Sequence, residues 1–338
     1  MGKILLHEGK VALVKTYTLA HNLKLVDVAP PIPGFKKFIS VYVLKARKVA
    51  LIDVGPSVSV ENLLSGLAEL NINPTDISYI FATHIHIDHA GGIGKVIKQM
   101  PNAIVIVHER GGQHLIDPAK LWEDSQRALG KLALKYGTIE PVPQDRILVA
   151  KDGMLLDLGE MEMEVLDTPG HASHHLSFVD RKEGRLFVGD AAGVYIRGLI
   201  IPDTPLPFNL EQTLTSLDKL IRLGATTLYY AHFGYATHAC DKLRYYKQQL
   251  ISWGNIIADC LEKKADWQEI YNEIREKDDV LARIDSLPLN ERRRELYFVK
   301  NSIMGFIGYF KRYGTEYIKQ HNKETGERRN SGDRGGDC

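Results

Sequence analysis

Cysteine is too scarce in this chain to organise its fold. The 338 residues contain three cysteines, Cys240, Cys260 and Cys338, which are widely spaced and odd in number. Folds that depend on disulfides carry dense, paired cysteines, and structural zinc sites use closely spaced cysteine pairs. The sequence therefore predicts neither a disulfide framework nor a thiolate metal site.

The chain also lacks an excess of charge and a long apolar run. Lys and Arg number 43 against 42 Asp and Glu, so no bulk charge attracts nucleic acid or an anionic membrane. No run approaches the ~18 apolar residues of a membrane span, and residues 1–8 lack the apolar core of a signal peptide. We therefore expect a cytoplasmic protein with a small-molecule substrate and with no nucleic-acid or membrane partner.

What the chain does contain is a cluster of histidines directly after one apolar run. Residues 77–82 read as a buried strand, and the motif T-H-I-H-I-D-H follows them. Residues two apart in an extended backbone point the same way, so His84 and His86 can grip one cation together. Asp88 and His89 lie past the bend and can face a second position. The alternative is a His-rich surface loop, which the further ligand-type residues downstream disfavour.

Three more ligand-type residues follow later strand-like runs. Pro169-Gly170 forces a turn that presents His171, while Asp190 and His232 each follow an apolar run. A carboxylate such as that of Asp190 can give one oxygen to each of two cations. Nitrogen and carboxylate donors without cysteine suit zinc, iron or manganese, and a catalytic metal keeps a place for water. The sequence therefore predicts two divalent metal ions, with Zn(2+) as the first expectation and Fe or Mn as alternatives.

Taken together, these motifs resemble those of the metallo-β-lactamase superfamily. T-H-I-H-I-D-H, T-P-G-H, G-D and A-H-F-G occur in this order, and the likeness covers about residues 10–237. It implies an α/β fold, a four-layer αβ/βα sandwich with a dinuclear site at one edge between two sheets. It also implies the distribution of ligands: His84, His86 and His171 for the first metal, Asp88, His89 and His232 for the second, and Asp190 as the bridge.

The likeness extends to one part of the superfamily. T-P-G-H-A-S-H-H and G-D-A-A-G look most like the glyoxalase II and lactonase branches. They imply a hydrolase that cleaves a thioester or lactone through a metal-bridging hydroxide, which Asp88 helps to aim. Lactonases place a tyrosine soon after the bridging aspartate, and Tyr195 is either such a donor to the substrate carbonyl or a packing residue. The alternative is a persulfide dioxygenase, an oxidoreductase with one iron on this scaffold, which the complete second ligand set disfavours.

Three regions are expected along the chain. They are a catalytic domain over 1–237, a helical region over 238–321, and a polar tail over 322–338 that should be disordered. Apolar residues recur at helical spacing in the second region, which predicts packing inside it or onto the sandwich, with a homodimer through these helices as the alternative. Arg292, Arg293 and Arg294 predict a solvated helix face or, alternatively, a catch for an anionic substrate. Nothing here matches the glutathione-binding residues of glyoxalase II.

The substrate pocket is expected between three segments and the helical region. The segments are 29–37, a Pro- and Gly-rich connection or flap, 109–136, in which 118–136 reads as helical, and 193–209, most of which reads as a long loop. A first strand is expected at 11–14. Asp53 follows another strand and is either a turn residue or a carboxylate that orients a metal-bound histidine.

Overall fold

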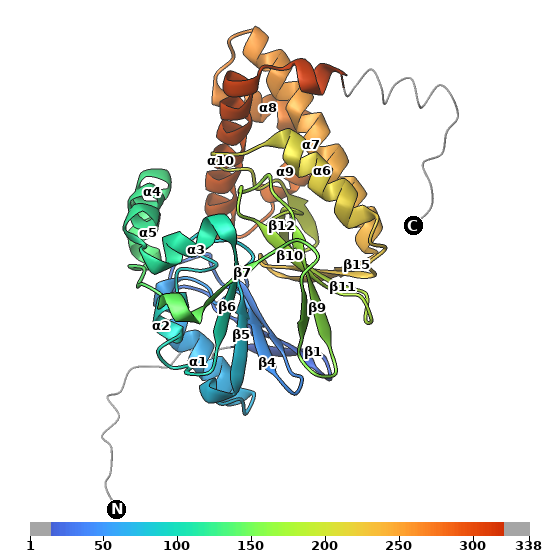
Figure 1. Cartoon of the computed structure of the whole chain (residues 1–338). Coiled ribbons are helices and arrows are strands. Elements are labelled where there is room, and N and C mark those ends of the chain that lie inside the picture. The colour runs from blue at the N-terminus through green and yellow to red at the C-terminus, as the bar shows by residue number, and fades with distance from the viewer. Residues whose placement is uncertain (1–14, 321–338) are drawn as a thin grey trace, which may run out of the picture.

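Two β-sheets pack face to face between layers of helices in residues 15–320, the part of the chain that the computed structural model describes (Figure 1). The first sheet has its strands in sequence order: β1 (Thr16–Ala20), β2 (Leu23–Asp27), β3 (Ser40–Leu44), β4 (Val49–Ile52), β5 (Ile77–Phe81), β6 (Ile104–His108) and β7 (Ile147–Ala150). The second sheet has the order β15 (Gly234–Thr237), β14 (Thr227–Tyr230), β11 (Arg185–Gly189), β10 (Leu176–Asp180), β9 (Glu162–Asp167) and β8 (Leu155–Asp157).

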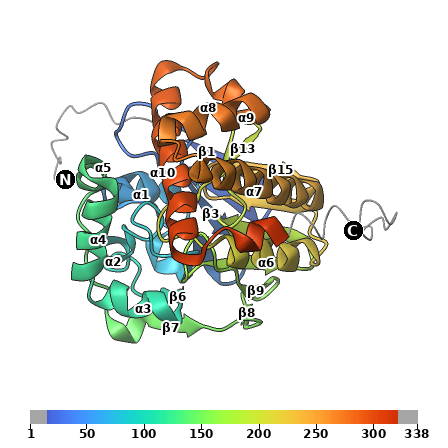
Figure 2. The ribbon, with the colours of Figure 1, turned by 90° about the horizontal axis from the view of Figure 1, so that it is seen from above.

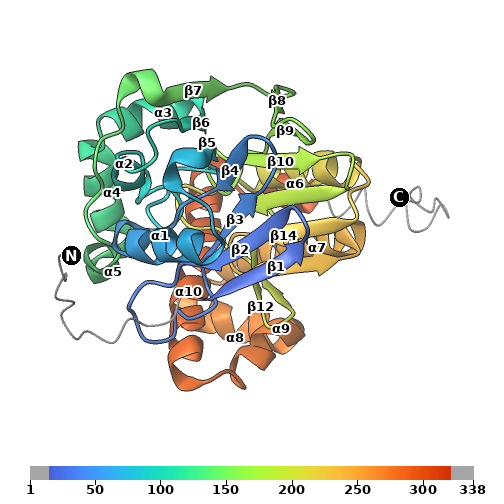
Figure 3. The same cartoon turned by 90° about the horizontal axis from the view of Figure 1, so that it is seen from below.

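Helices cover the outer face of each sheet. On the side of the first sheet lie α1 (Val60–Glu69), α2 (Ile93–Val96), α3 (Glu109–Ile116), α4 (Ala119–Leu129) and α5 (Lys131–Tyr136), with short 3-10 turns at Ser57–Ser59, Pro74–Asp76 and Gln144–Arg146. On the side of the second lie α6 (Leu210–Ile221) and α7 (Ala239–Glu262), followed by α8 (Trp267–Lys277), α9 (Asp279–Ile284) and α10 (Leu289–Tyr313). Figure 3 shows the two sheets from below, with α1 and α7 on opposite sides.

The alternation of side chains along each strand explains the layers. In β3, Val41 and Val43 point to the helices, whereas Tyr42 and Leu44 point into the space between the sheets. In β11, Phe187 enters the same space. Successive side chains of a strand point to opposite faces, so an apolar residue at every position buries both faces. Three apolar clusters thus fill the three spaces between layers, and the predicted four-layer α/β sandwich is confirmed.

The C-terminal helices pack onto the second sheet and onto one another. Leu250, Trp253 and Ile257 of α7 are fully buried together with Ile303 and Phe306 of α10, in the cluster that also contains residues of the second sheet. The two helical stripes therefore pack inside the chain. Figure 2 shows α7, α8 and α10 from above, where they lie over one end of the sandwich.

Several local expectations need correction. The helix expected over 118–136 is two helices, because Gly130 between them has a φ of +56°. The loop expected over 193–208 contains a two-stranded hairpin, β12 (Val194–Ile196) and β13 (Leu199–Ile201). The strand expected at 11–14 and the tail at 322–338 lie outside the described residues. Among the helices of residues 15–320, none has both the length and the apolar character that a bilayer crossing requires.

The connection after β13 is fixed to α10 by hydrogen bonds and by a close backbone approach. The backbone N–H of Thr204 donates to Ser302 Oγ at 3.1 Å, and Thr204 Oγ donates to the Ser302 carbonyl at 3.0 Å. One turn along the helix, a Cβ added to Gly305 would lie 1.6 Å from the carbonyl oxygen of Thr204. Only a glycine lets the two backbones meet here.

We predict that Gly305→Ala lowers the free energy of unfolding by about 1–3 kcal/mol through this clash. Helix propensity alone predicts a gain of about 1 kcal/mol for the same substitution, so the sign of the change separates the two effects. Urea unfolding followed by circular dichroism measures it. Met304→Ala, at a position 37% exposed, is the control and should stay within about 0.5 kcal/mol of the wild type. A stabilised Gly305→Ala protein would contradict the close approach.

Candidate metal centre

Loops that follow strands of both sheets meet at one edge of the sandwich. The loop after β5 carries the T-H-I-H-I-D-H motif, the loop after β9 carries His171, Asp190 directly follows β11, and His232 comes just after β14. The structure brings all seven sequence-predicted ligands together there. Within each of several groups, one donor atom per residue lies within 4.8 Å of the others: His84, His86 and His171; Asp88, His89 and His232; and His84, His89 and Asp190.

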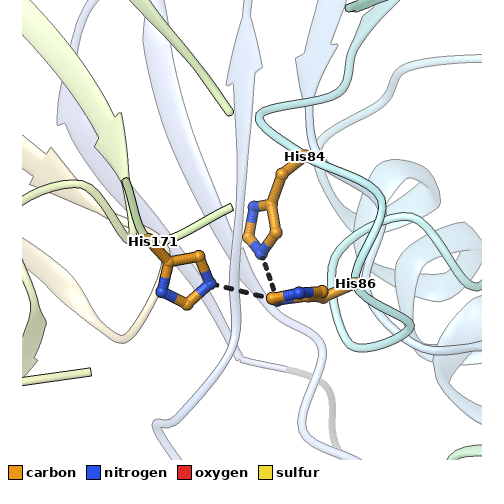
Figure 4. A group of neighbouring side chains, drawn as sticks. All are labelled: His84, His86 and His171. Carbon is orange, nitrogen blue, oxygen red and sulfur yellow. Dashed lines mark hydrogen bonds between the residues drawn. The ribbon is translucent and has the colours of Figure 1, made fainter. Parts of the chain in front are cut away.

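The first group consists of three imidazole rings that face one point. His84 Nε2 and His171 Nε2 each lie 3.0 Å from Nδ1 of His86, as the dashed lines in Figure 4 mark. A ring nitrogen carries either one proton or one lone pair, so His86 Nδ1 cannot satisfy both neighbours through a proton. Burial, with repulsion from the neighbouring imidazoles, holds the pKa values of His84 and His86 well below the usual range. Neutral rings with converging nitrogens fit a divalent cation.

The second group combines two imidazoles with a carboxylate. His232 Nε2 lies 3.6 Å from Asp88 Oδ2, and His89 Nε2 lies 3.9 Å from the same oxygen. Within residues 15–320, His89 Nε2 and Asp190 Oδ1 are buried side-chain atoms without a hydrogen-bond partner. Buried polar atoms are nearly always satisfied, so this pair of orphaned atoms marks a place for a cation. The donors here fit a second metal ion as well as the first group fits one.

Asp190 stands between the two groups. Its Oδ2 lies 3.6 Å from Nε2 of both His84 and His171 and 3.2 Å from His89 Nε2, while Oδ1 lies 3.8 Å from His232 Nε2. Burial alone would raise the pKa of this carboxyl, but His89 and His232 outweigh burial and hold its pKa well below the usual range. Oδ2 therefore faces rings of both groups and Oδ1 faces a ring of the second, so this ionised carboxylate lies where it could contact a cation in either group.

The other nitrogen of three of the ligand rings is held by a specific acceptor. His171 Nδ1 donates to the carbonyl of Asp203 at 2.9 Å, and His232 Nδ1 donates to the carbonyl of Phe38 at 2.8 Å. His89 Nδ1 donates to Asp53 Oδ2 at 3.1 Å. Such partners fix the tautomer and leave Nε2 available to a metal.

Asp53 has both of the roles that the sequence analysis gave as alternatives. It is a turn residue with a φ of +57°, and its carboxylate orients a histidine of the second group. The same carboxylate accepts hydrogen bonds from the backbone N–H of Thr83 and from Thr83 Oγ, both at 2.8 Å. Thr83 Oγ in turn lies 3.0 Å from His84 Nδ1, so one buried carboxylate positions a ligand of each group.

Sequence reasoning missed two residues that hold Asp190 in place. The backbone N–H of Asp190 donates to His175 Nε2 at 3.1 Å, and the other ring nitrogen of His175 lies 2.8 Å from Thr168 Oγ. Gly189, with a φ of +50°, makes room for this ring, because a Cβ there would lie 2.6 Å from His175 Nε2. The only signal for His175 was its place in T-P-G-H-A-S-H-H. For Gly189 there was none beyond the motif G-D.

Asp203 is a further group that no sequence pattern indicated. Its carboxylate comes within 4.8 Å of ligand atoms of His171 and Asp190, and burial together with the carboxylates of Asp190 and Asp88 raises its pKa well above the usual range. It lies in a Pro-rich connection, where neither periodicity nor ligand spacing could identify it.

A cavity of about 260 Å³ opens on both groups. Its lining includes His86, Asp88, His171 and Asp190, together with parts of α4 and α5, the connection 203–207, and Phe298 and Asn301 of α10. Two of the three segments expected around the pocket, and the helical region, therefore contribute. The third, 29–37, lies elsewhere and borders a separate hollow.

Tyr195 is not among the residues that line this cavity. Its ring stacks on Tyr230, with centroids 5.0 Å apart, and it borders the hollow beside segment 29–37. The structure thus places Tyr195 as a packing residue and not as a donor to a substrate beside the metal ligands. Its backbone is nevertheless linked to the site, because the N–H of Phe233, the neighbour of His232, donates to its carbonyl at 2.8 Å.

We predict that Asp53→Ala weakens metal binding by about 10- to 100-fold, because it removes the acceptor that orients His89 and Thr83. Competition with a chromophoric chelator measures the affinity. Asp27→Ala is a matched control: Asp27 is also buried and also accepts from backbone N–H groups, those of Ala29 and Lys37, but it contacts no ligand. Equal affinities of Asp53→Ala and wild type would remove Asp53 from the centre.

We also predict that the metal-free protein loses stability as the pH falls from about 8 to 5. Burial lowers the pKa values of His84, His86 and His175, and that of His174 to about 4, whereas unfolded histidine titrates near 6.5. Below pH ~6.5 these histidines therefore bind protons in the unfolded chain but stay neutral in the folded chain, and this difference favours unfolding.

His89 acts in the opposite sense. Burial disfavours its charge, but Asp190 and Asp88 outweigh burial and raise its pKa, so its contribution is present at low pH and is lost as the pH rises. Asp203, whose pKa is raised, acts in the same sense as His89. The six buried histidines with lowered pKa values outnumber these two groups, and the net slope follows the histidines. Urea unfolding of chelator-treated protein across this pH range tests the sign; a stability that rises toward pH 5 would refute it.

Comparisons with known proteins agree with this geometry. The family model described as the metallo-beta-lactamase superfamily matches residues 35–232, more than half of the chain. The metallo-beta-lactamase fold-containing protein ST1585 of Sulfurisphaera tokodaii is 34% identical over 205 residues, which are 59% of this chain and 74% of that protein. A hydroxyacylglutathione hydrolase of Vibrio cholerae is 28% identical over 203 residues, 60% of this chain and 64% of the relative, so this chain spans less than two thirds of that enzyme.

Solved structures show the same fold. The crystal structure of ST1585 superposes with a TM-score of 0.60 over 68% of this chain and 86% of its own, at 29% identity. The metallo-beta-lactamase family protein TTHA1429 of Thermus thermophilus gives a TM-score of 0.65 and covers 88% of this chain and 95% of its own, at 24% identity. The motifs, the four-layer fold and these matches together show that the chain belongs to the metallo-beta-lactamase superfamily.

Proposed function

We propose that this protein is a hydrolase with two divalent metal ions that cleaves an ester-like bond, a thioester or a lactone. The observation that carries the proposal is the presence of two donor groups with one carboxylate, Asp190, between them, beside a cavity that Asp190 also lines. When bound, two such cations lower the pKa of a water molecule and polarise a carbonyl oxygen, so hydroxide is available at neutral pH.

The residues of the chain take distinct roles in this proposal. His84, His86 and His171 hold the first cation, and His89, His232 and Asp88 the second. Asp88 also lines the cavity, with its side chain 15% exposed, so its carboxylate can accept a hydrogen bond from a water that attacks the substrate and orient it. The acceptors on the far side of His89, His171 and His232 keep these donors fixed, which preserves the geometry during turnover.

The relatives support hydrolysis at a carbonyl. Several are named hydroxyacylglutathione hydrolase, including that of Cupriavidus taiwanensis, which is 31% identical over 209 residues. Their name describes the removal of an acyl group by water, the reaction class proposed here. We do not extend glutathione to this chain, because the motif likeness concerns the metal ligands and not a binding site for that thiol.

We predict that His89→Ala and His232→Ala each lose about one metal ion per chain and lower thioester or lactone hydrolysis by about two orders of magnitude or more. Lewis-acid stabilisation supplies several kcal/mol, and about 1.4 kcal/mol corresponds to tenfold in rate. The first group does not contain either residue, so one metal ion should remain. Elemental analysis and a hydrolysis assay are run on the same samples.

His21→Ala is the control, since His21 is an exposed residue in the turn between β1 and β2. It should keep both ions and full activity. If the variants at His89 and His232 keep wild-type metal content, and the protein consumes oxygen with a persulfide instead of hydrolysing esters, the one-iron dioxygenase is the correct function and the hydrolase proposal fails.

A further inference from the structure

Away from the metal ligands, the wall of the cavity is mainly apolar. Its lining includes Leu121 and Leu129 of α4, Tyr136 of α5, Leu206 of the connection after β13, and Phe298 of α10. These side chains come from segments far apart in the sequence, and they line the same cavity as His86 and Asp88. A substrate group that enters beside the metal ligands therefore exchanges water for apolar contacts.

The cavity wall contains several histidines and Tyr136, and all of its other ionisable side chains are carboxylic acids. They are those of Asp88, Asp124, Asp190 and Asp203, and no lysine or arginine of residues 15–320 lines the cavity. Asp88 and Asp190 belong to the metal-ligand groups, while Asp203 has a side chain only 13% exposed. Beyond the metal ligands, a carboxylate or phosphate on the substrate would lose water here and meet no opposite charge.

Three basic side chains of α4 and α10 that could serve an anionic substrate have other partners. Lys120 and Arg127 pair with Asp124 at 3.2 and 3.0 Å, and both are 69% exposed, on the outside of α4. Arg294 of α10 is 5% exposed and is turned away, with its guanidinium 4.0 Å from the ring centroid of Phe38 and a hydrogen bond to the carbonyl of Gly34. For Arg294, both predictions are therefore wrong. It does not reach a substrate in the cavity, and it does not lie on a solvated helix face.

Phe298 is held rigidly in the wall. Its ring stacks on Phe38 with centroids 5.6 Å apart, and Phe38 itself is covered by Arg294. The cavity volume of about 260 Å³ is below the 300–1,000 Å³ usual for drug-sized ligands. If each non-hydrogen atom occupies about 30 Å³, as a water molecule does in the liquid, the cavity holds a group of on the order of ten non-hydrogen atoms.

We propose that this cavity selects an uncharged, apolar acyl group of medium length and excludes acyl groups that carry a negative charge, with Leu121 and Phe298 as specificity-determining residues. The inference rests on the proposed hydrolysis and names the substrate class of the same site. This substrate class distinguishes the chain from an enzyme that recognises a negatively charged thiol conjugate.

The first experiment compares three thioesters of N-acetylcysteamine, acetyl, hexanoyl and glutaryl, on the metal-loaded full-length protein. Each buried methylene adds about fourfold, so kcat/KM for hexanoyl should exceed that for acetyl by about tenfold or more. Glutaryl, similar in length but anionic, should fall below hexanoyl by about tenfold or more. A glutaryl rate equal to or above the hexanoyl rate would overturn the inference.

Variants of the cavity wall test which residues cause these substrate preferences. Leu121→Lys places a cation in the wall at a half-buried position and should reduce the hexanoyl-to-glutaryl ratio by about tenfold or more. Phe298→Ala should reduce the hexanoyl-to-acetyl ratio, because it shortens the apolar wall. Leu155→Lys is the matched control at an exposed leucine of β8 that does not line the cavity, and it should leave both ratios unchanged. Unchanged ratios in Leu121→Lys and Phe298→Ala would also overturn the assignment.

A binding measurement keeps the test independent of turnover. Isothermal titration compares hexanamide with glutaramate, which share an amide head and differ in the charge of the tail, and hexanamide should bind at least about tenfold more tightly. If no thioester or lactone is hydrolysed while this preference holds, the proposed function fails and the apolar cavity stands. If esters are hydrolysed but glutaramate binds as tightly as hexanamide, the hydrolase stands and the present inference fails.

Discussion

The carboxylate of Asp190, 2% exposed among imidazole rings, is the constraint on which the site depends. A carboxylate taken out of water costs several kcal/mol unless opposite charge and hydrogen bonds replace its hydration. Imidazole rings from both sheets surround it: His84 and His89 follow a strand of the first, and His171 and His232 follow strands of the second. Of these four rings only His89 has a raised pKa, and loops of both sheets thus meet at one buried carboxylate. Divalent cations bound there would join the loops of both sheets and add their binding free energy to folding.

Helix α10 links the C-terminal region to this edge. Its Arg294 pairs with Glu295, stacks over Phe38 and binds the carbonyl of Gly34, so the segment that precedes β3 is fixed against the helix. The carbonyl of Phe38 in turn accepts the proton of His232 Nδ1. The same helix gives Phe298 and Asn301 to the cavity wall and is joined to the connection that carries Asp203. The helical region is therefore part of the architecture of the site, although none of its described residues belongs to the donor groups.

Two kinds of information are separated in this fold. The donor set is common to a superfamily with many activities, so it indicates metal-assisted attack as the chemistry but does not indicate a substrate. The cavity wall depends instead on how α4, α5, the connection 203–207 and α10 come together. Its apolar surface, and the absence of lysine and arginine from the lining among the described residues, decide what is admitted, because an anion loses its hydration without gaining a partner while an alkyl chain gains from leaving water.

Local patterns in the sequence were sufficient to predict most of the strands, the two helical stripes and the seven ligand-type side chains that come together at the edge of the sandwich. Strand periodicity is local, and the ligands come just after strand-like runs, so pattern and spacing carry the information. The surroundings of single residues depend instead on the folded chain. Tyr195 follows Asp190 closely, yet its hairpin turns the ring onto Tyr230. Arg294 looked like one of three solvated arginines, but it is buried against a segment about 260 residues earlier in the chain. Such environments arise from contacts between distant segments, and no local pattern carries that information.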